Sequence, residues 1–172
     1  EKIWVLGLTI TGTATGSEVI TVVPASATSI YDVAANAAST SQNNNTATFT
    51  EKVVPTISSV SLNAANTLLF VTFSEDVYDT TGGSGELEVG DFALSISGGA
   101  ATVAATPSGI DKVSQSIVML TLNTSGTATG SETITVVPAT TTSIYDGAAN
   151  AASTSQSNNT ATFNDKAAPT MT

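Results

Sequence analysis

Apolar and polar residues alternate along several short stretches of this chain, with the period of two that is typical of half-buried β-strands. The expected strands lie at residues 56–62, 67–74, 91–97, 116–122, 132–138 and 159–163. The alternation predicts the inward-facing side chains Ile57, Val60, Leu62, Leu69, Val71, Phe73, Phe92, Leu94 and Ile96. No stretch has a long 3.6-residue period, and residues 143–146 fit a single helical turn or a loop equally well. Short strands separated by Gly, Asn, Asp and Pro predict an all-β sandwich.

The sequence repeats itself after 114 residues. Residues 11–25 (TGTATGSEVITVVPA) return as residues 125–139 (SGTATGSETITVVPA), and residues 29–49 return as residues 143–163. The first 58 residues, read from Ile3, form 56 pairs with residues 117–172, of which 17 differ and 39 match. A period of 114 residues is about the size of one immunoglobulin-like β-sandwich.

The repeat divides the chain into three parts. Residues 1–52 match the second half of a repeat, residues 53–166 form one complete repeat, and residues 167–172 begin a further one. The chain begins at Glu1 rather than Met, so we expect a longer parent protein with modules on both sides. The short linkers FTEKVVP (49–55) and FNDKAAP (163–169) each contain a proline, which stiffens the junction.

Three segments of the complete repeat carry a recognisable pattern, namely VTFSEDVYD (71–79), VGDFALSIS (89–97) and the closing SIYDGAANAAS (143–153). They resemble segments of the bacterial immunoglobulin-like tandem repeats of surface proteins. One departure is Ala149, where the family often has glycine before Asn150. Such repeats occur in S-layer proteins, adhesins and filaments. The resemblance implies immunoglobulin-like β-sandwich modules in tandem, an extracellular or cell-surface location, and a spacer, lattice or adhesion role without catalysis.

Composition narrows the chemistry further. Fourteen acidic residues against four basic ones give a net charge of −10, which disfavours nucleic acid and anionic membranes as partners. The absence of Cys and His removes thiol nucleophiles, imidazole bases and the usual zinc ligands. No apolar run approaches the roughly 18 residues of a membrane span. We therefore expect no catalytic residues, no enzymatic activity and no membrane insertion.

Acidic residues gather in the loops after the second expected strand and at the end of the repeat. The candidate calcium ligands are Glu75, Asp76, Asp79, Asp91 and Asp146. Calcium takes six to eight oxygen ligands from carboxylates, amides and carbonyls, and these loops contain such groups. The alternative is a solvated acidic loop, because no D-x-D-x-D-G string is present. Calcium is the one cofactor considered.

Other chemistries are less favoured. A glycosidase would need two carboxylates in a cleft, and nothing in the sequence predicts a cleft. Lys–Asn cross-links would involve Lys52, Lys112 or Lys166, yet Lys52 and Lys166 fall in linkers, where a lysine is usually an exposed charge. Strings of the form N-x-S/T begin at Asn44, Asn123 and Asn158, and Asn- and Thr-rich chains produce them by chance.

The leading functional hypothesis is a structural module of an extracellular repeat protein that forms a surface filament, sheath or S-layer type assembly. The alternative is a stalk or ligand-binding module of a large bacterial adhesin, which the near-identity of the repeats disfavours. Residues 1–52 carry only closing strands and would expose Ile20, Val22 and Phe49. We therefore expect self-association, with strands supplied by the preceding part of the polypeptide or by a neighbouring subunit.

Overall fold

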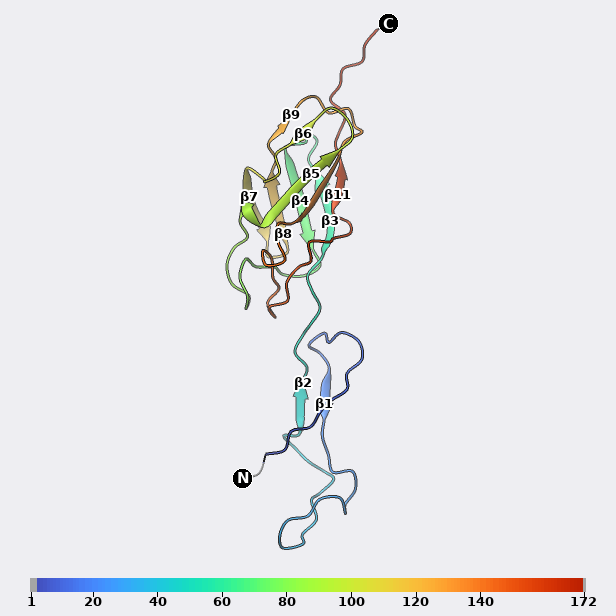
Figure 1. Ribbon diagram of the computed structural model, residues 1–172, viewed down its shortest axis with the longest axis vertical. Coiled ribbons are helices and arrows are strands. Elements are labelled where there is room, and N and C mark those ends of the chain that lie inside the picture. The colour runs from blue at the N-terminus through green and yellow to red at the C-terminus, as the bar shows by residue number, and fades with distance from the viewer. Residues whose placement is uncertain (1–2, 172) are drawn as a thin grey trace. The chain divides into compact units, whose positions relative to one another are not determined.

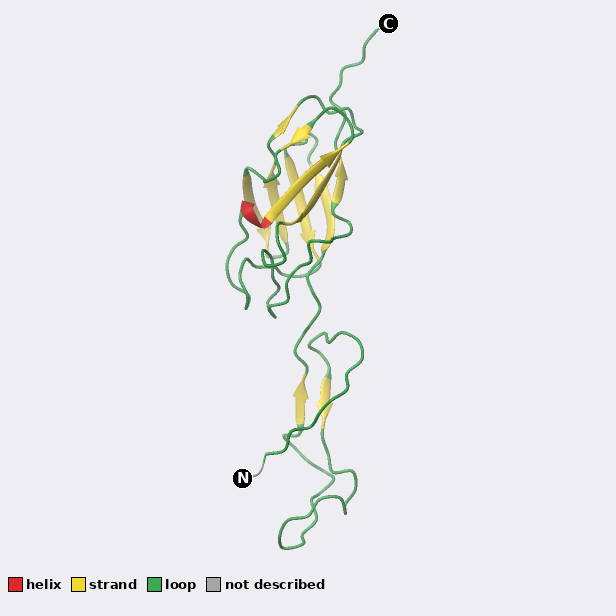
Figure 2. Ribbon diagram, viewed as in Figure 1, coloured by secondary structure: helices red, strands yellow, loops and turns green. Residues whose placement is uncertain are grey.

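The computed structural model describes residues 3–171, and their regular structure is almost entirely β (Figure 2). The helical element among them is one turn of 3-10 helix at Val89–Asp91. The chain divides into two compact units, Glu1–Val53 and Val54–Thr172, which we describe separately. The all-β prediction is confirmed, whereas the immunoglobulin-like tandem arrangement stays a prediction.

Seven strands of the second unit form two antiparallel sheets (Figure 1). One sheet has the order β3-β4-β8-β7 and the other has the order β11-β10-β5. The bounds are β3 Ile57–Leu62, β4 Leu68–Phe73, β5 Phe92–Ser97, β7 Gly109–Ser114, β8 Ile117–Thr121, β10 Thr133–Pro138 and β11 Thr160–Thr162. A separate short pair joins β6 (Thr102–Val103) to β9 (Thr124–Ser125).

The inner faces of the two sheets share a single hydrophobic core. Along β4 every second side chain is buried, namely Leu69, Val71 and Phe73, which is the pattern that a strand with one covered face requires. Between the sheets, the rings of Phe73 and Phe92 lie with their centroids 6.4 Å apart, tilted by 50°. Burying one such side chain stabilises the fold by about 1.5–3 kcal/mol.

Asparagine side chains fix the β3–β4 hairpin. The Asn63 carboxamide oxygen accepts hydrogen bonds from the backbone N–H groups of Thr67 and Leu68. Asn66 adopts a left-handed backbone conformation with φ of 59°, which asparagine tolerates better than most residues. The Asn66 side chain also exchanges hydrogen bonds with the backbone of Asn164 at 2.7 and 2.8 Å. The hairpin is thereby tied to the segment that follows β11.

All six expected strands are present, but the alternation misses β7 and the short strands β6 and β9. None of the β7 residues is buried, so that strand carries no apolar signal that a sequence pattern could show. Among the expected core residues, Val60, Leu62 and Ile96 are half-buried and pack against the core, and the remaining expected side chains are buried. Residues 143–146 form a loop rather than a helical turn.

Candidate functional site

The first unit is a half-module without a core. We use this name for its described residues, 3–53, and we call residues 54–166 the complete module. In the half-module β1 (Val19–Thr21) pairs with β2 (Thr46–Thr48), and none of the described residues is buried. The pairing of Ile20 with Ala47 reproduces the register of Ile134 with Ala161 in the complete module. The strand pair is therefore present without the sheet that would cover it.

Repeat-equivalent side chains differ sharply in exposure between the two units. Leu6 is 62% exposed, whereas its equivalent Leu120 is 0% exposed. Ile30 is 55% exposed, and its equivalent Ile144 is 0% exposed. The chemistry of these positions is identical, so the difference comes from the strands packed against them. In the complete module those strands include β3, β4 and β5, and the half-module contains no equivalent of them.

We use the name uncovered face for a set of apolar side chains in the half-module. Its members are exposed or half-buried, and each has a buried equivalent in the complete module. They are Trp4, Leu6, Leu8, Ile20, Val22, Ile30 and Phe49. Exposed apolar side chains that gather in this way are typical of interaction sites. The uncovered face is the candidate functional site.

Glu132 is a buried carboxylate directly before β10, and it connects this strand to the backbone of Ala100 and Ala101. Its Oε1 accepts hydrogen bonds from the backbone N–H groups of Ala100 at 2.8 Å and Ala101 at 3.1 Å. The Thr129 N–H donates to both carboxylate oxygens. Burial pushes the pKa of Glu132 upward, but backbone hydrogen bonds from Ala101, Glu132 itself, Thr129 and Ala100 outweigh it and lower the pKa to about 2. The side chain is therefore ionised and fully engaged.

The sequence prediction does not include Glu132 or its repeat equivalent Glu18. The available signal is the string TGSE, which occurs before both closing strands. In the half-module the Thr15 N–H donates to the Glu18 carboxylate at 3.0 and 3.1 Å, and the Thr15 hydroxyl donates at 2.8 Å. The Thr15 hydroxyl is the main reason that the pKa of Glu18 is lowered.

Asp146, one of the candidate calcium ligands, shapes its own loop. It is 1% exposed, and its Oδ1 accepts hydrogen bonds from the backbone N–H groups of Ala148 and Asn150. The Asn150 side-chain amide donates to Oδ2 at 2.8 Å. Asp32, its exposed repeat equivalent, makes the same contacts with Ala34 and Asn36. These hydrogen bonds explain why an aspartate occupies position 146.

The other four candidate ligands lie between β4 and β5. Glu75 and Asp76 follow β4, and Asp79 and Asp91 lie further along the same connection. The Asp91 carboxylate accepts a hydrogen bond from the Glu88 N–H at 2.7 Å, which caps the 3-10 turn. Burial, aided by the charges of Asp79 and Glu88, raises the pKa of Asp91. Within residues 3–171, no group of three or more acidic side chains converges as metal ligands would. Calcium binding stays a prediction.

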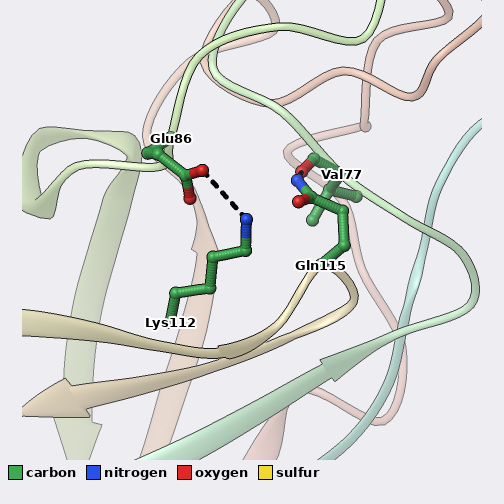
Figure 3. A network of polar contacts seen from close by, with 4 residues as sticks. All are labelled: Val77, Glu86, Lys112 and Gln115. Carbon is green, nitrogen blue, oxygen red and sulfur yellow. Dashed lines mark hydrogen bonds and ion pairs between the residues drawn. The ribbon is translucent and has the colours of Figure 1, made fainter.

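A hollow of about 220 Å³ lies beside Val118 in the complete module. Val77, Leu87 and Ile110 contribute to its apolar lining. At its polar side, Lys112 forms an ion pair with Glu86 at 2.9 Å, and the Gln115 amide donates to the Val77 carbonyl oxygen at 2.6 Å (Figure 3). Lys52 and Lys166, the other lysines considered for cross-links, are exposed.

Comparisons with known proteins identify no relative of this chain. No family model matches the chain, and no curated protein or solved structure matches it at a significant level. Within residues 3–171, no helix has the length and apolar character needed to span a membrane. The uncovered face therefore has to be interpreted from its own physical chemistry.

Proposed function

We propose that this chain is a structural part of an extracellular repeat protein, built from immunoglobulin-like modules in tandem, that works in a surface filament, sheath or S-layer type assembly. The observation that carries the proposal is the repeat. The strands β1 and β2 reproduce the register of β10 and β11, and the apolar residues of the uncovered face are nearly the same as their equivalents in the core of the complete module. Near-identical modules in tandem support a structural role.

The energetic argument favours association strongly. Each apolar side chain of this size contributes about 1.5–3 kcal/mol when it is fully buried. Among residues 3–171, β1 and β2 pair only with each other, so the outer edge of each strand is unpaired. Unpaired strand edges bind further strands through their backbone groups. The apolar face and the open edges together support a role in self-association rather than in catalysis.

The proposal is tested by the behaviour of the purified chain. Light scattering over a range of concentrations is expected to show association, and electron microscopy is expected to show ordered particles. Val22→Asp places a charge on the uncovered face and should reduce the association. Val19→Asp is the matched control, because the equivalent of Val19 is Thr133, which is only half-buried in the complete module. A monomer at every concentration, or equal effects of the two variants, would contradict the proposal.

A further inference from the structure

Three segments of the complete module line the hollow beside Val118. They are β7 with the turn after it, the start of β8, and the connection from β4 to β5. No residue of β7 is buried, so this edge strand does not fill the space between itself and the connection. The volume of about 220 Å³ exceeds the roughly 150 Å³ of an engineered cavity that binds benzene. The hollow therefore has room for a ring or a branched chain of about six carbon atoms.

The floor of the hollow belongs to the hydrophobic core. Val77 is 1% exposed and Val118 is 3% exposed, and the half-buried Leu87 and Ile110 pack against the same core. The Val77 N–H donates to the Gln115 carbonyl oxygen at 3.1 Å, and the Gln115 side-chain amide donates to the Val77 carbonyl oxygen at 2.6 Å. These two bonds hold the connection against the β7–β8 turn, so the hollow is preformed. Its apolar floor offers few hydrogen-bond partners to a water molecule.

One cation and one anion mark the rim of the hollow (Figure 3). The Lys112 ammonium donates to the Glu86 carboxylate at 2.9 Å, and the two side chains are 41% and 69% exposed. An ammonium group has three N–H donors and the ion pair uses one of them, so Lys112 can also donate to an oxygen atom of a ligand. Glu86 repels an anion, and Lys112 repels a cation. The rim therefore favours a neutral molecule that carries a hydrogen-bond acceptor.

We propose that this hollow binds a small neutral molecule that combines a ring or branched chain of about six carbon atoms with one carbonyl oxygen. The apolar part lies against Val77 and Val118, where it is removed from water. The carbonyl oxygen lies at the rim and accepts a hydrogen bond from Lys112. The hollow and the uncovered face belong to different units, so this site does not rest on the proposed function.

Cyclohexanone is a suitable probe, because it has a six-membered ring and one carbonyl oxygen. Titrated into the isotope-labelled 172-residue chain, it is expected to shift the amide resonances of residues 77, 87, 110 and 118. The shifts should follow one saturable curve in the millimolar range, as befits a ligand of so few atoms. Cyclohexylamine and cyclohexanecarboxylate, which are charged at pH 7, should bind about tenfold more weakly. Shifts that do not saturate, shifts confined to other residues, or equal binding of the charged molecules would overturn the proposal.

A pair of variants on the edge strand tests the position of the site. Ile110→Phe places a larger side chain in the hollow and should abolish binding of cyclohexanone. Val113→Phe is the matched control, because Val113 lies on the same strand, is 56% exposed and does not line the hollow. Circular dichroism checks that both variants fold, and if Ile110→Phe does not, the shifted amides of the wild-type protein locate the site. Equal affinities of the two folded variants would overturn the proposal.

A second pair tests the hydrogen bond at the rim. Lys112→Met keeps the apolar stem but removes the donors, so it should weaken cyclohexanone binding about fivefold. Binding of toluene, which has no carbonyl oxygen, should not change. Lys166→Met, at an exposed lysine outside the hollow, is the control for loss of one positive charge. Unchanged cyclohexanone binding, or equal losses for the two molecules, would overturn the contact with Lys112. A failed titration leaves the assembly role standing, and a monomeric chain that binds cyclohexanone overturns the assembly role alone.

Discussion

The half-module and the second half of the complete module make the same local hydrogen bonds but differ in almost every measure of burial. The Phe49 N–H donates to the Glu18 carbonyl oxygen at 2.9 Å, and the equivalent bond from Phe163 to Glu132 has the same length. The Asn45 side-chain amide donates to the Val22 carbonyl oxygen at 2.8 Å, as does that of the equivalent asparagine to Val136. The pairing of β1 with β2 and the loop shapes are therefore encoded locally. Residues 3–10, expected as a closing strand, form no strand, although their equivalents include β8 (Ile117–Thr121).

The backbone conformations of the two parts agree as well. Ala35 and Ala149 are both left-handed, with φ of 62° and 69°. The difference lies in what covers the inner face. Within the described residues, the complete module has a continuous core and the half-module has none. Comparing them separates what neighbouring residues determine from what only distant strands can supply.

The largest expected effect comes from deleting one core side chain in each part. Leu120→Ala should lower the free energy of unfolding of the complete module by about 2–5 kcal/mol, because it leaves a cavity among buried side chains. Leu6→Ala, the same change at the exposed equivalent, should change it by less than about 0.5 kcal/mol. Urea unfolding followed by circular dichroism measures both. Similar losses would mean that Leu6 is already buried in solution.

The second-largest effect is expected from changing the buried carboxylate Glu132. Glu132→Gln places an amide donor against the N–H groups of Ala100 and Ala101 and should lower the melting temperature at pH 7, whereas Glu18→Gln should leave the complete module unchanged. The folded pKa of Glu132, about 2, lies below its ordinary value of 4.5. Its contribution is therefore fully present above about pH 5 and is lost as the pH falls from about 5 toward 2.

Thermal melting measured between pH 7 and pH 2 reports how much ionised Glu132 contributes to stability. The wild-type protein is expected to lose more stability on acidification than Glu132→Gln, so the two melting curves should converge at low pH. Glu88→Gln, an exposed acid, serves as the control. Parallel losses in the wild-type and Glu132→Gln proteins would show that this carboxylate does not link stability to pH.

Removing the loop carboxylates Asp146 and Asp32 should change the stability of the complete module by different amounts, and this difference should be smaller than those above. Asp146→Ala leaves the N–H groups of Ala148 and Asn150 without their acceptor in a partly buried loop and should destabilise the complete module by about 1–3 kcal/mol. Asp32→Ala removes the same bonds where water can replace them, so we expect no change in the complete module. Denaturant midpoints report both effects. A neutral Asp146→Ala would argue that the loop keeps its shape through the backbone alone.

The smallest effect is expected from the left-handed alanine. Ala149→Gly should stabilise the complete module by up to about 1 kcal/mol, because the left-handed conformation costs alanine 1–2 kcal/mol and glycine loses part of that gain in chain entropy. Ala35→Gly should not change the complete module. Ala152→Gly, at a buried position without a positive φ, should destabilise it and is the control. Equal effects at positions 149 and 152 would contradict the argument.

Much of the fold can be predicted from the sequence because one face of most strands is covered. The alternation along β4 and β5 is a direct record of that burial. The edge strand β7 has no buried residue, so its register depends on pairing with β8 and leaves no pattern to read. Glu75 and Asp76 follow β4, as expected, but the 3-10 turn and the loop at Asp146 use two other predicted metal ligands to bind backbone N–H groups.

The site itself is harder to predict. The sequence shows that Ile20, Val22 and Phe49 repeat positions 134, 136 and 163, which alternation and spacing place in strands. It does not show that Glu132 is buried, since the donors at Ala100 and Ala101 lie more than 30 residues away and are ordinary backbone amides. An isolated acid in a polar string normally indicates solvent exposure. Only the folded arrangement shows that the turn at Gly98 and Gly99 brings the donors to the carboxylate.

The two edge strands of the four-stranded sheet limit the directions in which an assembly of these chains can grow. Its outer strands are β3 and β7, and each contains a register shift, between Ile57 and Ser59 and between Lys112 and Ser114. Such irregularities and the charges of β7 prevent a further strand from joining the sheet sideways. A second module therefore does not pair with β3 or β7 through a further strand. Under the proposed assembly role, we therefore do not expect an amyloid-like layer, in which sheets extend strand by strand.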